Sequence, residues 1–341
     1  MATAVALANF KLRKSGLLRK LSDRLASLKP SSKEFSRFIH SCAKLRFRDS
    51  SVLRLGLEYV QNPVFAPSAL DLGNIVYAFS KLGVKHQQSW DVLSAHILSN
   101  INTQPVLNLH IFAVANGIIG LFSDKLRLQL TKNILLKVSA FSPRQIADIL
   151  VGLSHSNIFD CDVISEGLRH CAMSWNYQTQ THRGISSKMN LFSFSLALEA
   201  PDILKTLPAS SVSILNSGNS IISPRFQRQN LDIVVDALLF LGFEKQKISN
   251  QSSVGPYKIG VCLQHSSKKT AVEVISDSCL CPITGELLGA RKMKHRHLCK
   301  LGYDRIVYLH STDLKKPLKR LIQKLAPELQ VTKVDDFKYI I

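Results

Sequence analysis

The sequence predicts an α+β protein of several domains, in which an N-terminal α-solenoid of helical-pair repeats precedes a small α/β domain. Three observations support this prediction: a 37-residue repeat in the first half, a serine-rich passage after it, and alternating helical and β-branched runs beyond that passage. With 341 residues, 45% of them hydrophobic, the chain is long enough for two cores. The predicted ranges are a basic segment at 1–32, repeats at 33–207, a linker at 208–227, the α/β domain at 228–326 and a tail at 327–341.

The first 32 residues are basic and amphipathic. Their only acid up to Lys29 is Asp23, and leucines recur at helical spacing from Leu17 to Leu28. This acid-poor pattern is typical of an organelle transit peptide. An ordinary surface helix of a basic protein is the alternative.

The repeat aligns four copies without gaps. Ser41, Ala78, Ala115 and Gly152 lie 37 residues apart and are all small, so that two helix backbones could approach closely there. Four further columns are apolar: Phe35, Leu72, Leu109 and Ile146; Phe38, Ile75, Phe112 and Ile149; Ile39, Val76, Ala113 and Leu150; Phe47, Val84, Leu121 and Ile158. Each copy continues with a second helical stretch, and such pairs bury their apolar faces only by stacking, which predicts an α-solenoid. A weaker, out-of-register fifth unit is expected at 189–207.

Beyond the linker, helices and strands alternate. We expect a helix, two strands, a helix, a strand and a last helix, at 228–243, 257–264, 268–276, 290–301, 304–309 and 314–325. Gly302 suits the C′ position of the second helix.

The helix at 290–301 has an apolar arc and a cationic arc. The apolar arc contains Ala290, Met293, His297, Leu298 and Leu301, and the cationic arc contains Arg291, Lys292, His295, Arg296 and Lys300. Lys294 falls within the apolar arc, where we favour snorkelling to the edge over projection into a polar pocket. The last helix is basic through Lys315, Lys316, Lys319 and Arg320, and both helices together predict a continuous positive ridge.

The charge of the chain restricts its partners. Lys and Arg number 44 against 24 Asp and Glu, a net charge of +20, which favours nucleic acid or an anionic membrane surface. The sequence contains no run of eighteen apolar residues, so it predicts no membrane span. The seven cysteines form no C-x-x-C pair, which indicates a reducing compartment.

The C-terminal part resembles the RAP domain of organellar RNA proteins. The resemblance covers about 231–325 and rests on Tyr257-Lys-Ile, on Ala271-Val-Glu-Val, on the run from Lys292 to Leu309 and on the closing basic helix. It implies RNA binding in a mitochondrion, or alternatively a plastid, with a role in RNA processing, stability or ribosome assembly. It also implies a fold similar to PD-(D/E)xK nucleases and helical repeats ahead of the domain.

RNA binding assigns roles to the cations and to three aromatic residues. The expected phosphate contacts are Arg291, Lys292, Lys294, His295, Arg296, Lys300, Lys315, Lys316, Lys319 and Arg320. Tyr257, Tyr303 and Tyr308 are candidates for stacking on bases, although Tyr303 could equally pack at the helix–strand junction. A structural protein of the mitochondrial ribosome, bound to ribosomal proteins as well as RNA, would need the same surfaces. We expect no cofactor.

A metal-dependent endoribonuclease is the enzymatic alternative. That chemistry requires carboxylates on neighbouring strands to hold Mg²⁺. Gly260 replaces the first acid, Glu273 lacks the lysine of an E-x-K motif because Ile275 follows it, and Asp277 and Lys294 are weak substitutes. The blander interpretation is that Glu273 pairs with a helix cation such as Lys294.

A zinc site is a second alternative, from Cys279 and Cys281 near His295 and His297. The cysteines are closer in sequence than structural zinc sites require, and histidines two apart on a helix diverge. We therefore expect no metal, and interpret His297 as a core histidine with a satisfied hydrogen bond.

Overall fold

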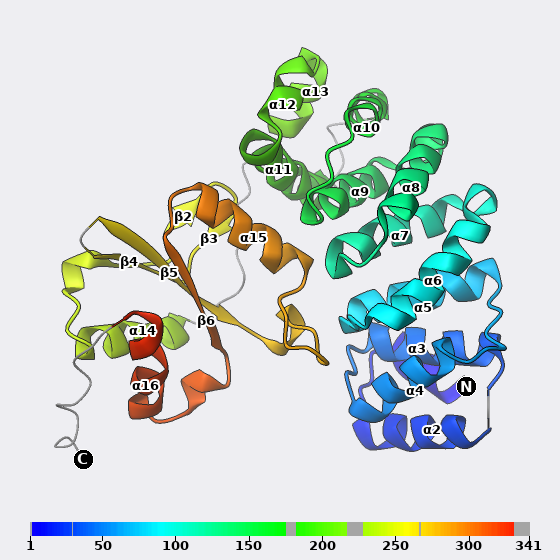
Figure 1. The fold of residues 1–341 in the computed structure, drawn as a ribbon, viewed down its shortest axis with the longest axis horizontal. Helices are drawn as coiled ribbons and strands as arrows, with labels where there is room; N and C mark the ends of the chain where they lie inside the picture. Colours follow the sequence, from blue (N-terminus) through cyan, green and yellow to red (C-terminus); the bar gives the residue numbers. More distant parts are fainter. Residues whose placement is uncertain (1, 29, 175–181, 217–227, 266, 331–341) are drawn as a thin grey trace. The chain divides into compact units, whose positions relative to one another are not determined.

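A computed structural model describes residues 2–28, 30–174, 182–216, 228–265 and 267–330 (Figure 1). The chain folds into two compact units. Unit 1 consists of 1–218 and 280–293, and unit 2 of 219–279 and 294–341. Unit 1 is helical, and unit 2 contains a mixed sheet with helices.

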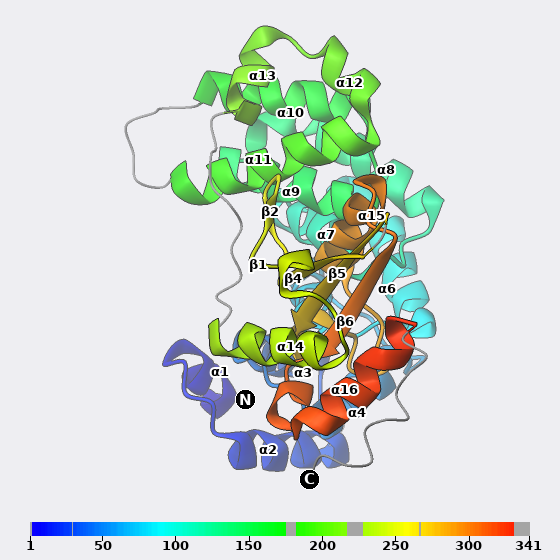
Figure 2. The ribbon, with the colours of Figure 1, turned by 90° about the vertical axis from the view of Figure 1, so that its left-hand side faces the viewer.

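Helical pairs make up unit 1. The first helices of four pairs begin 37 residues apart, at α3 (Ser32–Lys44), α5 (Ala69–Leu82), α7 (Val106–Ile119) and α9 (Pro143–His155). Their partners are α4 (Ser50–Val60), α6 (Gln87–Ser99), α8 (Asp124–Leu136) and α10 (Cys161–Ser174), with short 3-10 turns at Ile101–Thr103 and Val138–Ala140. Pairs at the two ends are α1 (Ala2–Asn9) with α2 (Ser15–Leu28), and α11 (His182–Glu199) with α12 (Pro201–Thr206) and α13 (Ala209–Asn216). Figure 2 shows the pairs stacked from α1 and α2 at one end to α12 and α13 at the other.

The starts of the first helices are fixed by local chemistry. The side chains of Ser31, Ser68 and Ser142 each accept a hydrogen bond from the amide three residues ahead. The side chains of Glu34 and Gln145 in turn accept a hydrogen bond from the backbone N–H of the capping serine, which completes a capping box at α3 and α9. These caps satisfy amides that would otherwise lack partners at a helix start. They occur at the same position of three of the four copies, whereas Pro105 precedes α7 and makes no side-chain cap.

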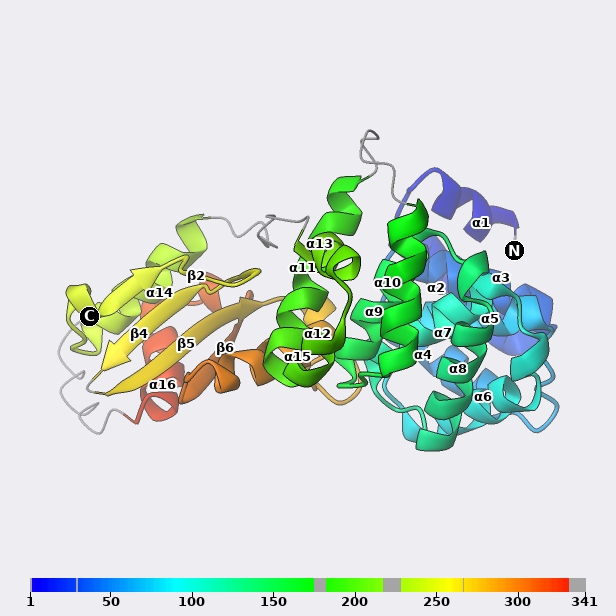
Figure 3. The same cartoon turned by 90° about the horizontal axis from the view of Figure 1, so that it is seen from above.

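Two layers of helices enclose the core of unit 1. First helices pack on first helices and second helices on second helices. Figure 3 shows these helices from above. The first three apolar columns of the repeat are buried throughout, from Phe35 at 0% exposure to Ile146 at 2%. The last column is only partly buried, because Leu121 and Ile158 are half-exposed while Phe122, next to Leu121, takes the buried place.

Backbone approach between α7 and α9 requires glycine. A Cβ added to Gly117 would lie 2.2 Å from the carbonyl oxygen of Gly152. Gly152 is the small residue of the fourth repeat, so its predicted role in close packing is confirmed at this pair of helices.

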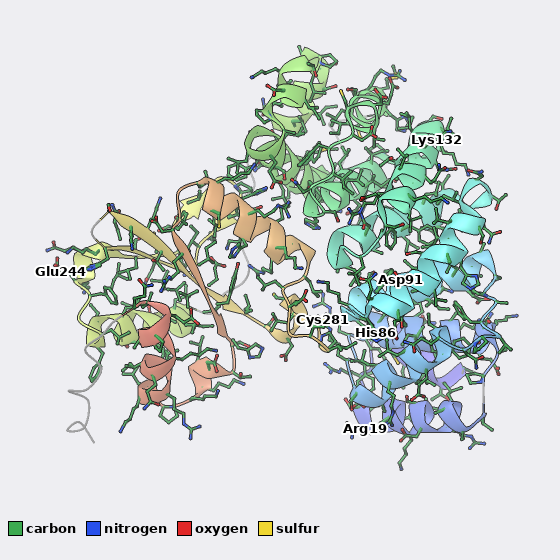
Figure 4. All side chains as sticks on the ribbon, viewed as in Figure 1. Arg19, His86, Asp91, Lys132, Glu244 and Cys281 are labelled. Atoms are coloured by element: carbon green, nitrogen blue, oxygen red, sulfur yellow. The ribbon has the colours of Figure 1, made fainter. Side chains whose placement is uncertain are left out.

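The basic N-terminal segment packs on the first repeat. α1 packs against α3 and α2 against α4, with Ala4 and Leu18 fully buried. Arg19, labelled in Figure 4, binds the Asp49 carboxylate at 2.6 Å. That contact holds the pKa of Asp49 at about 2, because the Arg19 hydrogen bond favours the charged form. Organelle targeting by this segment stays a prediction.

The prediction of a linker at 208–227 is wrong for its first half. Residues 209–216 form α13, which packs on α10 and α11 and buries Ile214 and Leu215. Its serines suggested a loop, but tertiary burial of two apolar residues outweighs weak local preference. The rest of the predicted linker, 217–227, and the tail from 331 lie outside the described residues.

Unit 2 is built on a four-stranded sheet of order β1-β4-β5-β6. The strands are β1 (Ile248–Asn250), β4 (Val261–His265), β5 (Lys268–Ile275) and β6 (Arg305–His310), and a two-stranded hairpin joins β2 (Ser253–Val254) to β3 (Tyr257–Lys258). β5 and β6 are parallel, and the other pairs of the large sheet are antiparallel. The strand expected at 257–264 is therefore split at Ile259 and Gly260.

The helices of unit 2 cover opposite faces of this sheet. α14 (Arg228–Phe240) and α16 (Leu318–Glu328) pack with Val272, Val274 and Val307. The alternate face carries Ala271, which packs with Leu298 of α15 (Gly289–Lys300). Figure 1 shows α14 and α16 on one side of the sheet and α15 on the other.

Leu280–Met293, which follows β5 and includes the start of α15, belongs to unit 1, and this differs from the predicted range of the α/β domain. A Cβ on Gly289 would lie 1.8 Å from the carbonyl oxygen of Gly117, so the backbones touch. Arg48 donates a hydrogen bond to the Leu280 carbonyl at 3.1 Å, and Lys85 forms an ion pair with Glu286. Leu280–Met293 therefore packs along the C-terminal ends of the first helices.

Candidate nucleic-acid interface

The structure changes the role assigned to Lys294. Its side chain is 5% exposed, and its Nζ donates to Glu273 Oε2 at 2.6 Å and to the Lys258 carbonyl at 2.7 Å. The prediction of a phosphate contact is wrong, and so is the snorkelling interpretation. The buried Glu273 carboxylate beneath the helix satisfies the ammonium, which confirms the interpretation that Glu273 pairs with a helix cation such as Lys294.

The predicted continuous ridge does not form. α15 and α16 pack on opposite faces of the sheet, so their cations cannot line one surface of unit 2. Of the α15 cations, Lys300 is exposed, His295 and Arg296 are half-buried, and Arg291 and Lys292 belong to unit 1.

Acids neutralise part of the predicted cation set. Lys292 lies 3.4 Å from Glu286, and Lys316 lies 2.8 Å from Asp313. Burial would raise the pKa of Asp313, but hydrogen bonds from Lys316 and Lys324 outweigh it and hold that pKa at about 2. Lys315, Lys319 and Arg320 are exposed.

Two of the three stacking candidates are buried. Tyr257 and Tyr303 are 6% and 3% exposed, so their rings cannot receive a base, and both predictions are wrong. Tyr257 shares a 2.7 Å hydrogen bond with His297 Nδ1, which makes His297 the satisfied core histidine that the sequence predicts. Tyr308 is half-buried and stacks on His295, with 5.9 Å between ring centroids.

The nuclease-like carboxylate is neutralised. Glu273 is fully buried, Oε1 accepts the Gly260 N–H at 3.2 Å, and Oε2 accepts the Lys294 ammonium. A Cβ on Gly260 would lie 2.8 Å from the Val272 carbonyl oxygen, so an acid does not fit there without a backbone shift. Asp277 is exposed and pairs instead with His310 at 2.9 Å. The two carboxylates thus contact separate basic side chains, Lys294 and His310.

The cysteines proposed for zinc belong to a turn. Cys281 (Figure 4) is buried, and its sulfur accepts the N–H groups of Ile283 and Thr284, both at 3.4 Å. Burial would raise the Cys281 pKa, but these hydrogen bonds outweigh it and lower the pKa. Within the described ranges, no group of three or more His, Cys, Asp or Glu side chains could hold a metal.

The first helices of the repeats expose one face, and the sequence alone could not show which positions of each repeat lie on it. Besides the apolar columns, the aligned repeats contain three columns whose positions lie one helical turn apart in succession. Their residues are at least partly exposed in the first two copies. There they hold Arg37, His40 and Lys44 on α3, and Asn74, Tyr77 and Lys81 on α5, which we call the basic basin. The same columns hold Ile111, Val114 and Ile118 on α7, and Asp148, Val151 and His155 on α9.

Direct contacts join the two halves of the basic basin. His40 Nδ1 lies 2.8 Å from Asn74 Oδ1, and the His40 ring stacks on Tyr77 with centroids 5.0 Å apart. Lys81 Nζ lies 5.9 Å from the Tyr77 centroid. Cations beside stacked rings are the combination that single-stranded nucleic acid requires. The signal was available in the aligned repeats as three columns that change character between copies, whereas the core columns stay apolar.

Comparison with known proteins gives no match: no protein-family model matches the chain, and neither does any curated protein. Among the helices that the structure describes, none is long and apolar enough to cross a bilayer.

Proposed function

We propose that this chain is an organellar RNA-binding protein of the RAP-domain kind, acting in a mitochondrion in RNA processing, RNA stability or ribosome assembly. The observation that supports this function best is the basic basin, because none of its six positions carries an acid. The net charge of +20 adds long-range attraction for a polyanion. The elements α14, β4, β5, α15, β6 and α16 follow the order that the sequence pattern predicts, with the short strands β1, β2 and β3 added between α14 and β4.

In this proposal the phosphates of single-stranded RNA contact Arg37, Lys44 and Lys81. Such contacts release counterions and provide affinity and register without reading sequence. Lys315, Lys319 and Arg320 of unit 2 add further phosphate contacts.

The test is the salt dependence of RNA binding. Each lost phosphate contact lowers the slope of log affinity against log salt by about 0.7 for a single strand, so R37A/K44A/K81A lowers it by about 2. Fluorescence anisotropy with a labelled single-stranded RNA, from low to high salt, measures this slope.

The matched control is K20A/K125A/K132A, which removes the same charge from exposed positions on α2 and α8. We expect this control to retain most of the wild-type slope. Equal slopes in the two triple variants would place RNA binding elsewhere, and the absence of RNA binding at low salt would reject the function.

A further inference from the structure

A pocket of about 680 Å³ lies between α1, α3 and α5 of unit 1 and is lined in part by residues of the basic basin. Ala2 and Ala6 of α1 line one side, and Arg37, His40 and Lys44 of α3 and Asn74 of α5 line the other. The volume falls within the range of small-molecule sites. The pocket exists because α1 presents alanines, whose short side chains leave the space next to α3 unfilled.

Its two sides differ in chemistry. The α1 side is apolar through Ala2, Val5 and Ala6 and ends in the polar Asn9, whereas His40 and Asn74 contribute hydrogen-bonding groups from α3 and α5. A nucleobase has this pairing of properties, a flat apolar face and a polar edge, and single-stranded RNA is recognised through unstacked bases held in this way.

His40 and Asn74 offer both kinds of hydrogen-bonding group. Burial lowers the pKa of His40, so its ring is neutral at pH 7. Because the Asn74 carbonyl oxygen only accepts, the 2.8 Å bond assigns the His40 proton to Nδ1 and leaves Nε2 as an acceptor. The Asn74 amide nitrogen supplies donors, so a donor and an acceptor stand side by side.

Cations stand at both ends of the pocket. Arg37 and Lys44 both line it and are seven residues apart on α3, which is about 10 Å along the helix axis. Both are exposed and can move toward a phosphate. A base between them would have a cation within reach of the phosphate on each side.

We propose that this pocket binds one unstacked base of single-stranded RNA, with the flanking phosphates contacting Arg37 and Lys44. The inference rests on the proposed function and names the place where a base, rather than the backbone, is bound. The pocket requires α1, so the inference applies to the chain that retains α1 packed on α3.

The experiment fills the pocket without changing charge. In the full chain, A6W closes it from α1, and A2W fills it from one turn away. T3W is the matched control, because Thr3 is an exposed residue of α1 outside the pocket lining. Binding of a single-stranded RNA decamer is measured across a salt series, with circular dichroism to check the fold.

We expect A6W and A2W each to weaken binding about 5- to 140-fold, the range for losing one stacked base, at an unchanged salt slope. T3W should bind like the wild type, and A6W and T3W should bind a decamer that is abasic at every position equally, because no base is then left to enter the pocket. An unchanged slope of log affinity against log salt shows that a weakened variant is folded and still contacts the phosphates.

Equal affinity of A6W, A2W and T3W, with the wild-type slope preserved, would overturn the base pocket and leave RNA binding by the basic basin intact. Competition by a free nucleoside monophosphate as effective as the decamer would also overturn it, since the site would then be one for free nucleotides. The proposed function fails separately, through the absence of RNA binding by the wild type.

Discussion

Replacing Lys294 by methionine removes one partner of a buried ion pair and nearly preserves side-chain volume. The Lys294 and Glu273 side chains are 5% and 0% exposed, so solvent cannot compensate the carboxylate that remains. Breaking a buried pair from one side costs about 3–5 kcal/mol. We therefore expect K294M to lower the free energy of unfolding of unit 2 by that amount.

The double variant E273Q/K294M separates charge from packing. It contains no unpaired buried charge, and the side-chain amide carbonyl that E273Q introduces can still accept the Gly260 N–H, which Glu273 accepts at 3.2 Å in the wild type. The remaining cost is that of lost hydrogen bonds, about 1–2 kcal/mol. The double variant should therefore be more stable than K294M alone.

Amide hydrogen exchange in β5 and β6, followed by mass spectrometry, measures the stability of unit 2. K319M is the control, because Lys319 is exposed on α16 and should change stability by less than about 0.5 kcal/mol. A cost below about 1 kcal/mol for K294M, or additive costs in the double variant, would refute the buried pair as the element that fixes α15 to the sheet.

Two further predictions concern local stability. The pKa of Asp313 is about 2 in the folded protein, below its unfolded value near 4, so its charged form contributes up to about 2 kcal/mol to the free energy of unfolding above pH 5. This contribution is lost as the pH falls toward 2. The free energies of urea unfolding of the wild type and of D313N should therefore differ at pH 7 and converge at pH 2. G289A should cost about 1–3 kcal/mol and increase amide exchange in 280–290, because its Cβ would meet the Gly117 carbonyl, whereas G16A, where nothing lies within 4 Å, should leave exchange unchanged.

Local chemistry made much of the fold predictable. The serine caps and the apolar columns act within one helix or one pair, so the 37-residue period was visible in the chain itself and the first helices begin at that period. Gly302 was placed correctly after α15 for the same reason, since its φ of +80° is a backbone requirement that a single residue type satisfies.

The candidate site was less predictable, because exposure is a property of neighbours. The helical wheel separated the arcs of α15, but it could not show that α16 packs on the other face of the sheet. The pairing of Lys294 with Glu273, 21 residues away in sequence, was one of the sequence interpretations, but the helical wheel alone favoured snorkelling. Tyr257 and Tyr303 have the residue type that stacks on bases, yet their rings are buried.

The sequence by itself determined the period of the repeat, the helical pairs, the order of elements in the C-terminal domain and the excess of positive charge, because each depends on residues close together in the chain. Only the tertiary structure decided which cations share a surface, that Leu280–Met293 packs with the repeat, and that His40 of α3 stacks on Tyr77 of α5. These outcomes depend on backbone approach and burial between segments that are distant in the chain. Residue type and spacing within one segment do not report on either.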